Sequence, residues 1–241
     1  MGKRQTNRGS KETPVVFPAI PWLVDGNKFE PFLESALAHL KAQVCPDAKV
    51  LPPFLSEPYP LGTTFNIKEQ MGFLNVKLNE IIEAFLESDA THIWFVDADC
   101  ETPPSALRKL LEMDVDVASG ISPPHFSMKK STVLRWMPPA SPEYEWSRPY
   151  YRAYNLRDVY GKIFGEDRII ATGHFCMLCK RRVFEGDPPL RFIYEPPQRL
   201  ANEVLFWQTA QELGFSCRIN GEILCGHLPQ FPLKIILEEF E

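Results

Sequence analysis

The stretch THIWFVDADCETPP, residues 91 to 104, ends an uncharged apolar run in two aspartates, Asp97 and Asp99. The run from Ile93 to Val96 is β-branched and aromatic, which is typical of a strand buried on both faces. Burying two unpaired carboxylates in such a strand would be costly, so the pair must lie at the carboxyl end of the strand. Open α/β sheets form their ligand crevice at that edge. The stretch therefore predicts a divalent-metal site at the mouth of a sheet.

Strand-like and helix-like segments alternate on both sides of this stretch. The segments VVFPAIPW, VLPPFL and DVDVASGI have the character of strands, and helical apolar stripes begin near Phe29 and Asn66. After the aspartates, Thr102 is placed to cap a helix that opens with Pro103 and Pro104. The alternation predicts an α/β fold, a single Rossmann-like domain whose mostly parallel central sheet carries helices on both faces.

Changes in composition predict the domain boundaries. Residues 1 to 13 hold four basic residues and almost nothing apolar, which predicts a flexible tail. The domain is expected over residues 14 to 228, followed by a C-terminal extension over residues 229 to 241. Within the domain, residues 122 to 165 are rich in proline and aromatic residues and lack periodicity, so we expect an irregular insert that acts as a lid.

The composition narrows the class of protein and its location. The 241 residues include 26 basic and 31 acidic side chains, and the net charge of −5 argues against a surface that coats nucleic acid. No apolar run is long enough to span a bilayer, and the polar start lacks the apolar region of a signal peptide. The six cysteines include a single CxxC, Cys176 and Cys179, inside a strand-like segment, which favours small buried residues in a reducing compartment. We expect a cytoplasmic protein without an integral membrane segment.

The spacing of Asp97 and Asp99 supplies hard oxygen ligands, which suit Mg²⁺ or Mn²⁺ with coordination sites left for substrate phosphates. An ion held there can neutralise a diphosphate as it becomes a leaving group. The alternative interpretation of the two aspartates is an acidic turn on the surface. The buried run before the pair favours a metal site over this alternative. His227 follows the last apolar strand, and an imidazole ligand would shift the preference from Mg²⁺ toward Mn²⁺. Glu203 lies in the first turn of a helix, where the dipole favours a carboxylate whatever its function.

In their order along the chain, these segments resemble the inverting nucleotide-sugar glycosyltransferases of the GT-A fold, in the large family 2 type. The resemblance runs from about Val15 to Leu228. FPAIP corresponds to a strand end whose loop meets the nucleotide, and WFVDAD corresponds to the metal and diphosphate motif. A helix before that motif bears an Arg-Asn pair in the family; here Asn79 matches, and Leu78 replaces the arginine.

The second half of the chain matches the same family in the same order. DVDVASGISPP corresponds to a strand that runs into a glycine-containing loop, and ATGHFCMLCKRRVFE to a glycine-containing strand followed by basic residues. The family then has an acidic pair that opens a helix ending in glycine. Alignment on Gly214 puts Asn202 and Glu203 over that pair, so Glu203 takes the place of the catalytic aspartate. His227 takes the place of the metal-binding histidine.

The resemblance implies a site and a reaction. Asp97, Asp99 and His227 would hold Mn²⁺ or Mg²⁺ against the diphosphate, and Glu203 would take a proton from an acceptor hydroxyl. The implied donor is a nucleotide-diphosphate sugar, and the acceptor is a glycan, a lipid, a protein or a modified base. The residues implied to contact the nucleotide sugar are Pro18, Ile20, Pro21, Asn79, Asp97, Asp99, Gly120, Gly173 and His174.

Three alternatives stay open beside the transferase. Asn202 and Leu78 depart from the family pattern, so a protein of this fold that binds sugar or nucleotide without turnover is one. A phosphatase of the haloacid dehalogenase type also uses an aspartate pair after an apolar strand, but that strand normally comes first, and Glu101 stands where the type has Thr or Val. A sugar nucleotidylyltransferase expects a glycine-rich basic loop after its first strand, which FPAIPWLVDG does not offer.

Overall fold

The structure is a computed structural model, and it describes residues 12–21, 30–56, 67–136, 151–165, 170–193, 202–238 and 240. Nearly all of the predicted basic tail therefore lies outside the described residues. The same holds for Asn66, near which a helical stripe is predicted to begin, and for residues 137–150 of the predicted insert.

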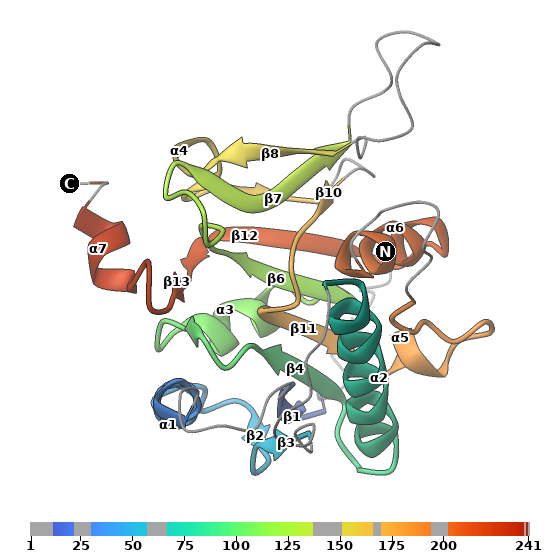
Figure 1. The fold of residues 1–241 in the computed structure, drawn as a ribbon. Helices are drawn as coiled ribbons and strands as arrows, with labels where there is room; N and C mark the ends of the chain where they lie inside the picture. Colours follow the sequence, from blue (N-terminus) through green and yellow to red (C-terminus); the bar gives the residue numbers. More distant parts are fainter. Residues whose placement is uncertain are drawn as a thin grey trace, which may run out of the picture.

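An eight-stranded sheet forms the centre of the fold (Figure 1). Its strands lie in the order β2-β1-β4-β11-β6-β12-β9, and β3 also pairs with β1. β1 is parallel to β2, β3 and β4, and β12 is parallel to β6, whereas β11 runs antiparallel between β4 and β6. The predicted α/β fold with a mostly parallel sheet is confirmed. The strands are β1 Val15–Ile20, β2 Lys49–Val50, β3 Phe54–Leu55, β4 His92–Val96, β6 Val117–Ile121, β9 Ile163–Phe164, β11 Cys176–Lys180 and β12 Cys217–Leu224.

Helices cover both faces of this sheet, as predicted. One face carries α2 (Ile67–Leu86), α5 (Arg182–Glu185) and α6 (Asn202–Glu212), and the other carries α1 (Glu30–Lys41) and α3 (Ala106–Glu112). The side chains of β4 alternate between the two cores. Ile93 and Phe95 belong to the core under α2 and α6, while Trp94 and Val96 belong to the core under α1 and α3. All four are fully buried, which explains why the run before the aspartates carries no polar residue.

The helix after the aspartates begins later than predicted, at Ala106, and its cap is not Thr102. The side-chain oxygen of Gln43, which follows α1, accepts a hydrogen bond from the backbone N–H of Leu107 (3.1 Å). The amide nitrogen of Gln43 donates to the carbonyl of Pro103 (3.0 Å). A side chain from a distant part of the chain thus satisfies the helix end, which local spacing does not reveal.

The region predicted to be an irregular insert, residues 122 to 165, contributes two strands to a second, three-stranded sheet. β7 (Lys130–Trp136) pairs antiparallel with β8 (Tyr151–Asn155) and with β10 (Ile170–Ala171), and α4 (Leu156–Val159) follows β8. The expectation of irregular backbone is wrong for these residues. In β7 the buried side chains are Ser131 and Val133, so the strand alternates as expected, but the serine at a buried position hides the pattern.

The last residues of the chain pack onto the domain. β13 (Gly226–His227) pairs antiparallel with β5 (Cys100–Glu101), and α7 (Leu233–Glu238) buries Ile236. The carboxylate of Glu101 accepts a hydrogen bond from the backbone N–H of Leu233 (2.6 Å). This pairing ties the C-terminal segment to the residues that directly follow the aspartate pair.

The structure tests two further predictions, that the cysteines are small buried residues and that no segment spans a membrane. All six cysteines are free thiols, and all except Cys45 are buried, in agreement with the prediction of small core residues. Burial raises the pKa of the Cys100 thiol to about 12, so this thiol stays protonated at neutral pH. Among the described residues, no helix is both long enough and apolar enough to cross a membrane.

Candidate metal site

Four chain segments meet at one edge of the central sheet. β4 ends at Val96, directly before Asp97, and β6 ends at Ile121. β11 runs the opposite way, with Cys176 opposite Val96, so its amino end lies at the same edge. β12 leads through β13 to His227. The aspartates therefore lie where two other strand ends and the start of β11 converge (Figure 1).

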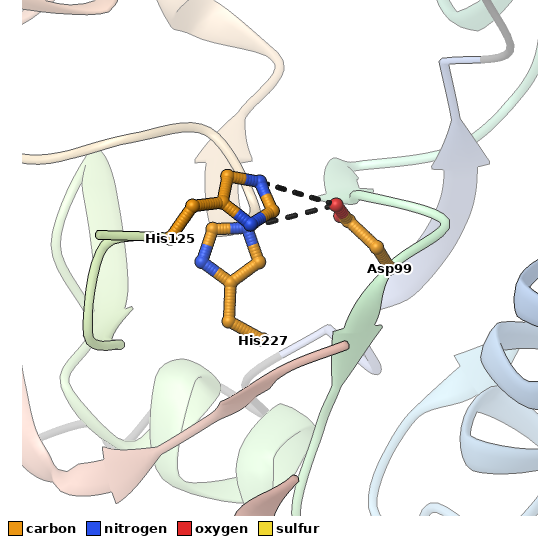
Figure 2. A group of neighbouring side chains, drawn as sticks. All are labelled: Asp99, His125 and His227. Carbon is orange, nitrogen blue, oxygen red and sulfur yellow. Dashed lines mark ion pairs between the residues drawn. The ribbon is translucent and has the colours of Figure 1, made fainter. Parts of the chain in front are cut away.

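Three side chains at this edge form a compact group, shown in Figure 2: Asp99, His125 and His227. The Oδ2 atom of Asp99 lies 3.6 Å from the Nε2 atom of His125 and 3.6 Å from the Nε2 atom of His227. One ligand atom from each residue lies within 4.8 Å of the other two. The two imidazole rings are tilted by 39° with their centroids 3.4 Å apart. Three donor atoms this close together fit a single metal ion.

Hydrogen bonds on the far side of each ring orient the histidines. The Nδ1 atom of His227 lies 2.9 Å from the carbonyl oxygen of Pro123, to which it donates. Because that proton occupies Nδ1, neutral His227 keeps its lone pair on Nε2, the atom that faces Asp99. The Nδ1 atom of His125 lies 3.3 Å from the side-chain oxygen of Gln230. An oriented imidazole of this kind is the usual arrangement of a metal-ligating histidine.

The backbone holds Asp99 and His227 together. β13 pairs with β5 so that His227 stands opposite Cys100. The N–H of Leu228 donates to the carbonyl of Asp99 (2.9 Å). Burial alone would lower the pKa of His227, but the hydrogen bonds to Asp99 and to the Pro123 carbonyl raise it above its usual value. A bound cation would compete with the proton on Nε2.

Asp97 has a different partner. Its Oδ1 atom lies 2.9 Å from the Nδ1 atom of His174, which is 8% exposed. Burial alone would lower the pKa of His174, but Asp97, Glu203 and Asp99 raise it to about 9. His174 is therefore a buried cation at neutral pH, beside the first aspartate of the pair.

Glu203 lies in the first turn of α6 and is partly buried. Its charge is among those that raise the pKa of His174, so the fold brings Glu203 within electrostatic reach of the histidine that binds Asp97. The structure thus gathers Asp97, Asp99, His174, His227 and Glu203 at one edge, although they span more than half of the sequence. The side chain of Asn202 lies outside the described residues.

The residues predicted at the end of β1 lie beside the aspartate strand. β1 pairs in parallel with β4, with Ala19 opposite Phe95, so Ile20 and Pro21 reach the same edge as Asp97. Pro18, Ile20 and Pro21 are all buried. The loop that follows them, residues 22–29, lies outside the described residues.

Asn79 is engaged by the protein itself. Its amide nitrogen donates to the carbonyl of Phe192 (3.0 Å), and its amide oxygen accepts from the N–H of Phe192 (3.0 Å). The ring of Phe192 meets that of His174 edge to face, with centroids 6.1 Å apart. Asn79 therefore anchors a segment that packs on the site. Leu78, which replaces the family arginine, is fully buried in the core.

The two predicted glycines are positions of close packing. A Cβ atom on Gly120 would lie 2.6 Å from the carbonyl oxygen of Ile223, where β6 meets β12. A Cβ atom on Gly173 would lie 2.9 Å from the ring of Phe175. Both glycines shape the edge by allowing these contacts, and their role toward a nucleotide sugar stays a prediction.

The sequence reasoning missed His125. The residue lies in the proline-rich region that the sequence predicts to be an irregular lid, where no periodicity indicates a ligand. A usable signal was present, because His125 follows the end of β6 in SPPHF just as Asp97 follows the end of β4. β4 and β6 run in the same direction on either side of β11, so polar side chains that follow their ends lie at one edge of the sheet.

The chain was compared with known protein families, curated proteins and solved structures. No protein-family model matches the chain, and no curated protein matches its sequence. Among solved structures the chain is similar to A197 from STIV, at 14% identity over 90% of this chain and 86% of that chain, with a TM-score of 0.46. It is also similar to CMP:2-keto-3-deoxy-manno-octonic acid synthetase complexed with CTP, at 11% identity over 93% of this chain and 96% of that chain, with a TM-score of 0.44.

Proposed function

We propose that the protein is a metal-dependent glycosyltransferase that moves a sugar from a nucleotide-diphosphate sugar to an acceptor hydroxyl, with inversion at the anomeric carbon. The observation that carries the proposal is the convergence of Asp99, His125 and His227, with donor atoms within 4.8 Å of one another. This group lies at the edge of an α/β sheet where ligands bind. The order of motifs that resembles inverting GT-A enzymes supplies the reaction.

The donor set fits a transition-metal ion. One carboxylate and two imidazoles favour Mn²⁺ over Mg²⁺, because Mg²⁺ prefers oxygen ligands. An ion bound by Asp99, His125 and His227 would supply positive charge that stabilises the departing nucleoside diphosphate. Asp97, which was also predicted as a ligand, has its Oδ1 atom engaged by His174 and is not one of the three grouped side chains.

His174 offsets the negative charge of the site. Its pKa of about 9 keeps it protonated at neutral pH, beside Asp97. A site of three carboxylates without such a cation would repel a diphosphate. We propose that His174 lets the donor bind next to the aspartates.

Glu203 is the proposed base. It accepts the proton of the acceptor hydroxyl while that oxygen forms a bond to the anomeric carbon. The bond from the anomeric carbon to the donor phosphate oxygen breaks on the opposite side, and its electron pair leaves with the nucleoside diphosphate. One displacement of this kind inverts the anomeric centre.

Transfer and binding can be separated with Glu203→Gln. We expect the variant to bind nucleoside diphosphate and Mn²⁺ as wild type does, because Gln keeps the size of the side chain. Turnover of the donor should fall by about 100-fold or more, the usual contribution of a general base. The assay is nucleoside diphosphate release from a panel of donor sugars with Mn²⁺, and Glu212→Gln at the other end of α6 is the control. Full turnover by Glu203→Gln would remove this residue as the base.

A binding protein without turnover is the second candidate, and Asn202 in place of the first family acid favours it. Binding of a nucleoside diphosphate by the wild type, with no release from any donor in the panel, would select it. Hydrolysis of a simple phosphate monoester would instead point to a phosphatase.

A further inference from the structure

A cavity of about 500 Å³ lies between the small sheet and the edge strand β9 of the central sheet. Its lining includes Lys130, Arg135 and Lys162 as cations, and Tyr154 and Phe164 as aromatic residues. None of these residues belongs to the group of Asp99, His125 and His227. A volume of this size suits a small organic ligand.

The cavity is positively charged in an acidic protein. Its three cations face a single lining carboxylate, that of Asp158. Lys130, Arg135 and Lys162 make no ion pair within the described parts of the chain. Some cations elsewhere in the protein are paired, such as Lys109 with Glu222 and Lys180 with Asp114. Unpaired cations that surround one hollow attract an anion.

Hydrogen bonds fix the polar side chains of this cavity. The Nζ atom of Lys130 donates to the Oδ1 atom of Asn155 (3.0 Å), and the Nδ2 atom of Asn155 donates to the Oδ2 atom of Asp158 (2.8 Å). The Nζ atom of Lys162 donates to the carbonyl of Asp158 (2.7 Å). Each ammonium group retains further donor protons, so both lysines are held in place with hydrogen-bonding capacity to spare.

Aromatic rings form the apolar part of the lining. The rings of Tyr154 and Phe164 lie 5.6 Å apart, and the guanidinium of Arg135 lies over the Tyr154 ring at 5.2 Å. Arg135 is thereby held over an aromatic surface while its N–H groups stay available for an anion. Ring faces of this kind pack against the C–H face of a sugar.

We infer that this cavity binds an anionic sugar, with its acidic group held by Lys130, Arg135 and Lys162 and its ring against Tyr154 and Phe164. The sugar carries a phosphate or a carboxylate. The inference does not rest on the proposed transferase activity, because the cavity shares no residue with the metal site.

Calorimetric titration of the full chain in the presence of a metal chelator tests the inference. The probes are a hexose 6-phosphate, a hexuronic acid, neutral hexose and inorganic phosphate. We expect the hexose phosphate to bind more tightly than inorganic phosphate, and the neutral hexose not to bind measurably. Comparison of the hexose phosphate with the hexuronic acid identifies which acidic group the cavity prefers.

Two variants place the binding in the cavity. Arg135→Gln and Lys162→Gln should each weaken the binding of the anionic sugar by about tenfold, since each removes one charge-assisted contact. Lys49→Gln, on the edge strand β2 at the opposite end of the sheet, should change nothing. Arg135 is exposed, so its replacement should leave the unfolding temperature unchanged. Absence of binding by both anionic sugars, or equal affinity in the wild type and in both cavity variants, would overturn the inference.

Discussion

Charged side chains are bound differently at the amino ends and at the carboxyl ends of the central parallel strands. At the amino end of β6, the side chain of Asp116 is fully buried and is bound on both oxygens by Arg182 (2.5 and 2.6 Å). The backbone N–H and hydroxyl of Ser216 complete its hydrogen bonds. At the other edge, Asp97 and Asp99 face only histidines among the described residues. The protein satisfies its own charges at the first end and leaves donor groups for a ligand at the second.

One histidine lies near each of these ends, and the pKa values of the two are shifted in opposite directions. Burial lowers the pKa of His92, at the start of β4, to about 4, with Lys180 adding to the effect. His174, beyond the far end of the same strand, has its pKa raised to about 9 by Asp97 and Glu203 despite burial. One histidine is neutral and the other charged at pH 7. Neighbouring carboxylates, not depth in the protein, make the difference.

The largest expected effect comes from Asp99→Asn. Loss of an anionic ligand should reduce Mn²⁺-dependent donor turnover by about 1000-fold, corresponding to several kcal/mol of transition-state stabilisation. The free energy of unfolding without metal should change by less than about 1 kcal/mol, because the ion pairs that Asp99 makes with described residues are long, at 3.6 Å. Donor turnover and urea unfolding measure the two quantities. A large loss of stability with little loss of turnover would make Asp99 a structural residue.

Asp116→Asn should show the reverse pattern. The variant loses a carboxylate that binds Arg182 and Ser216, so the free energy of unfolding should fall by about 3 kcal/mol. Metal affinity should be unchanged. Asp114→Asn is the matched control, because its pair with Lys180 is exposed and should contribute less than about 1 kcal/mol. Equal stability of the two variants in urea would contradict this reading of the amino end.

The acid side of the stability profile should report His92. Its pKa is about 4 in the folded protein and near 6.5 when unfolded, so the unfolded chain binds the proton more readily. The contribution of neutral His92 to the free energy of unfolding is therefore complete above pH 6.5. It is lost as the pH drops toward 4, which lowers the free energy of unfolding by about 2 to 3 kcal/mol. His92→Gln should flatten this part of the profile, while His39→Gln should not. The same slope in wild type and His92→Gln would assign the acid sensitivity elsewhere.

The smallest effect is expected from His125→Gln. His125 is half exposed and is the most accessible of the three grouped side chains. Its loss should weaken Mn²⁺ binding by about tenfold and reduce the preference for Mn²⁺ over Mg²⁺. Competitive metal titration measures both. If the variant kept the Mn²⁺ affinity and the metal preference of the wild type, His125 would not be a metal ligand.

Local sequence patterns predicted features that depend on neighbouring residues, such as a buried strand or the end of a helix. The uncharged run before Asp97 gave the buried strand β4, because a strand covered on both faces excludes polar side chains. Gly214, with φ of 83°, follows the end of α6 as expected of a helix-terminating glycine. In β7, by contrast, polar residues on a small sheet concealed the strand period.

The candidate site depends on long-range pairing, which local patterns do not contain. His227 was placed beside the aspartates by resemblance, and the pairing of β13 with β5 provides the physical cause. His125 was missed because the region after β6 was treated as a lid. Asn79 shows the limit of matching single letters, since its amide is bound to the backbone of Phe192.

Anomalous scattering from crystals grown with Mn²⁺ tests the central claim most directly. We predict a manganese peak bonded to the Oδ2 atom of Asp99 and to the Nε2 atoms of His125 and His227, and its loss in Asp99→Asn. A fully occupied manganese peak elsewhere on the protein, with these three side chains unchanged and unligated, would contradict the account.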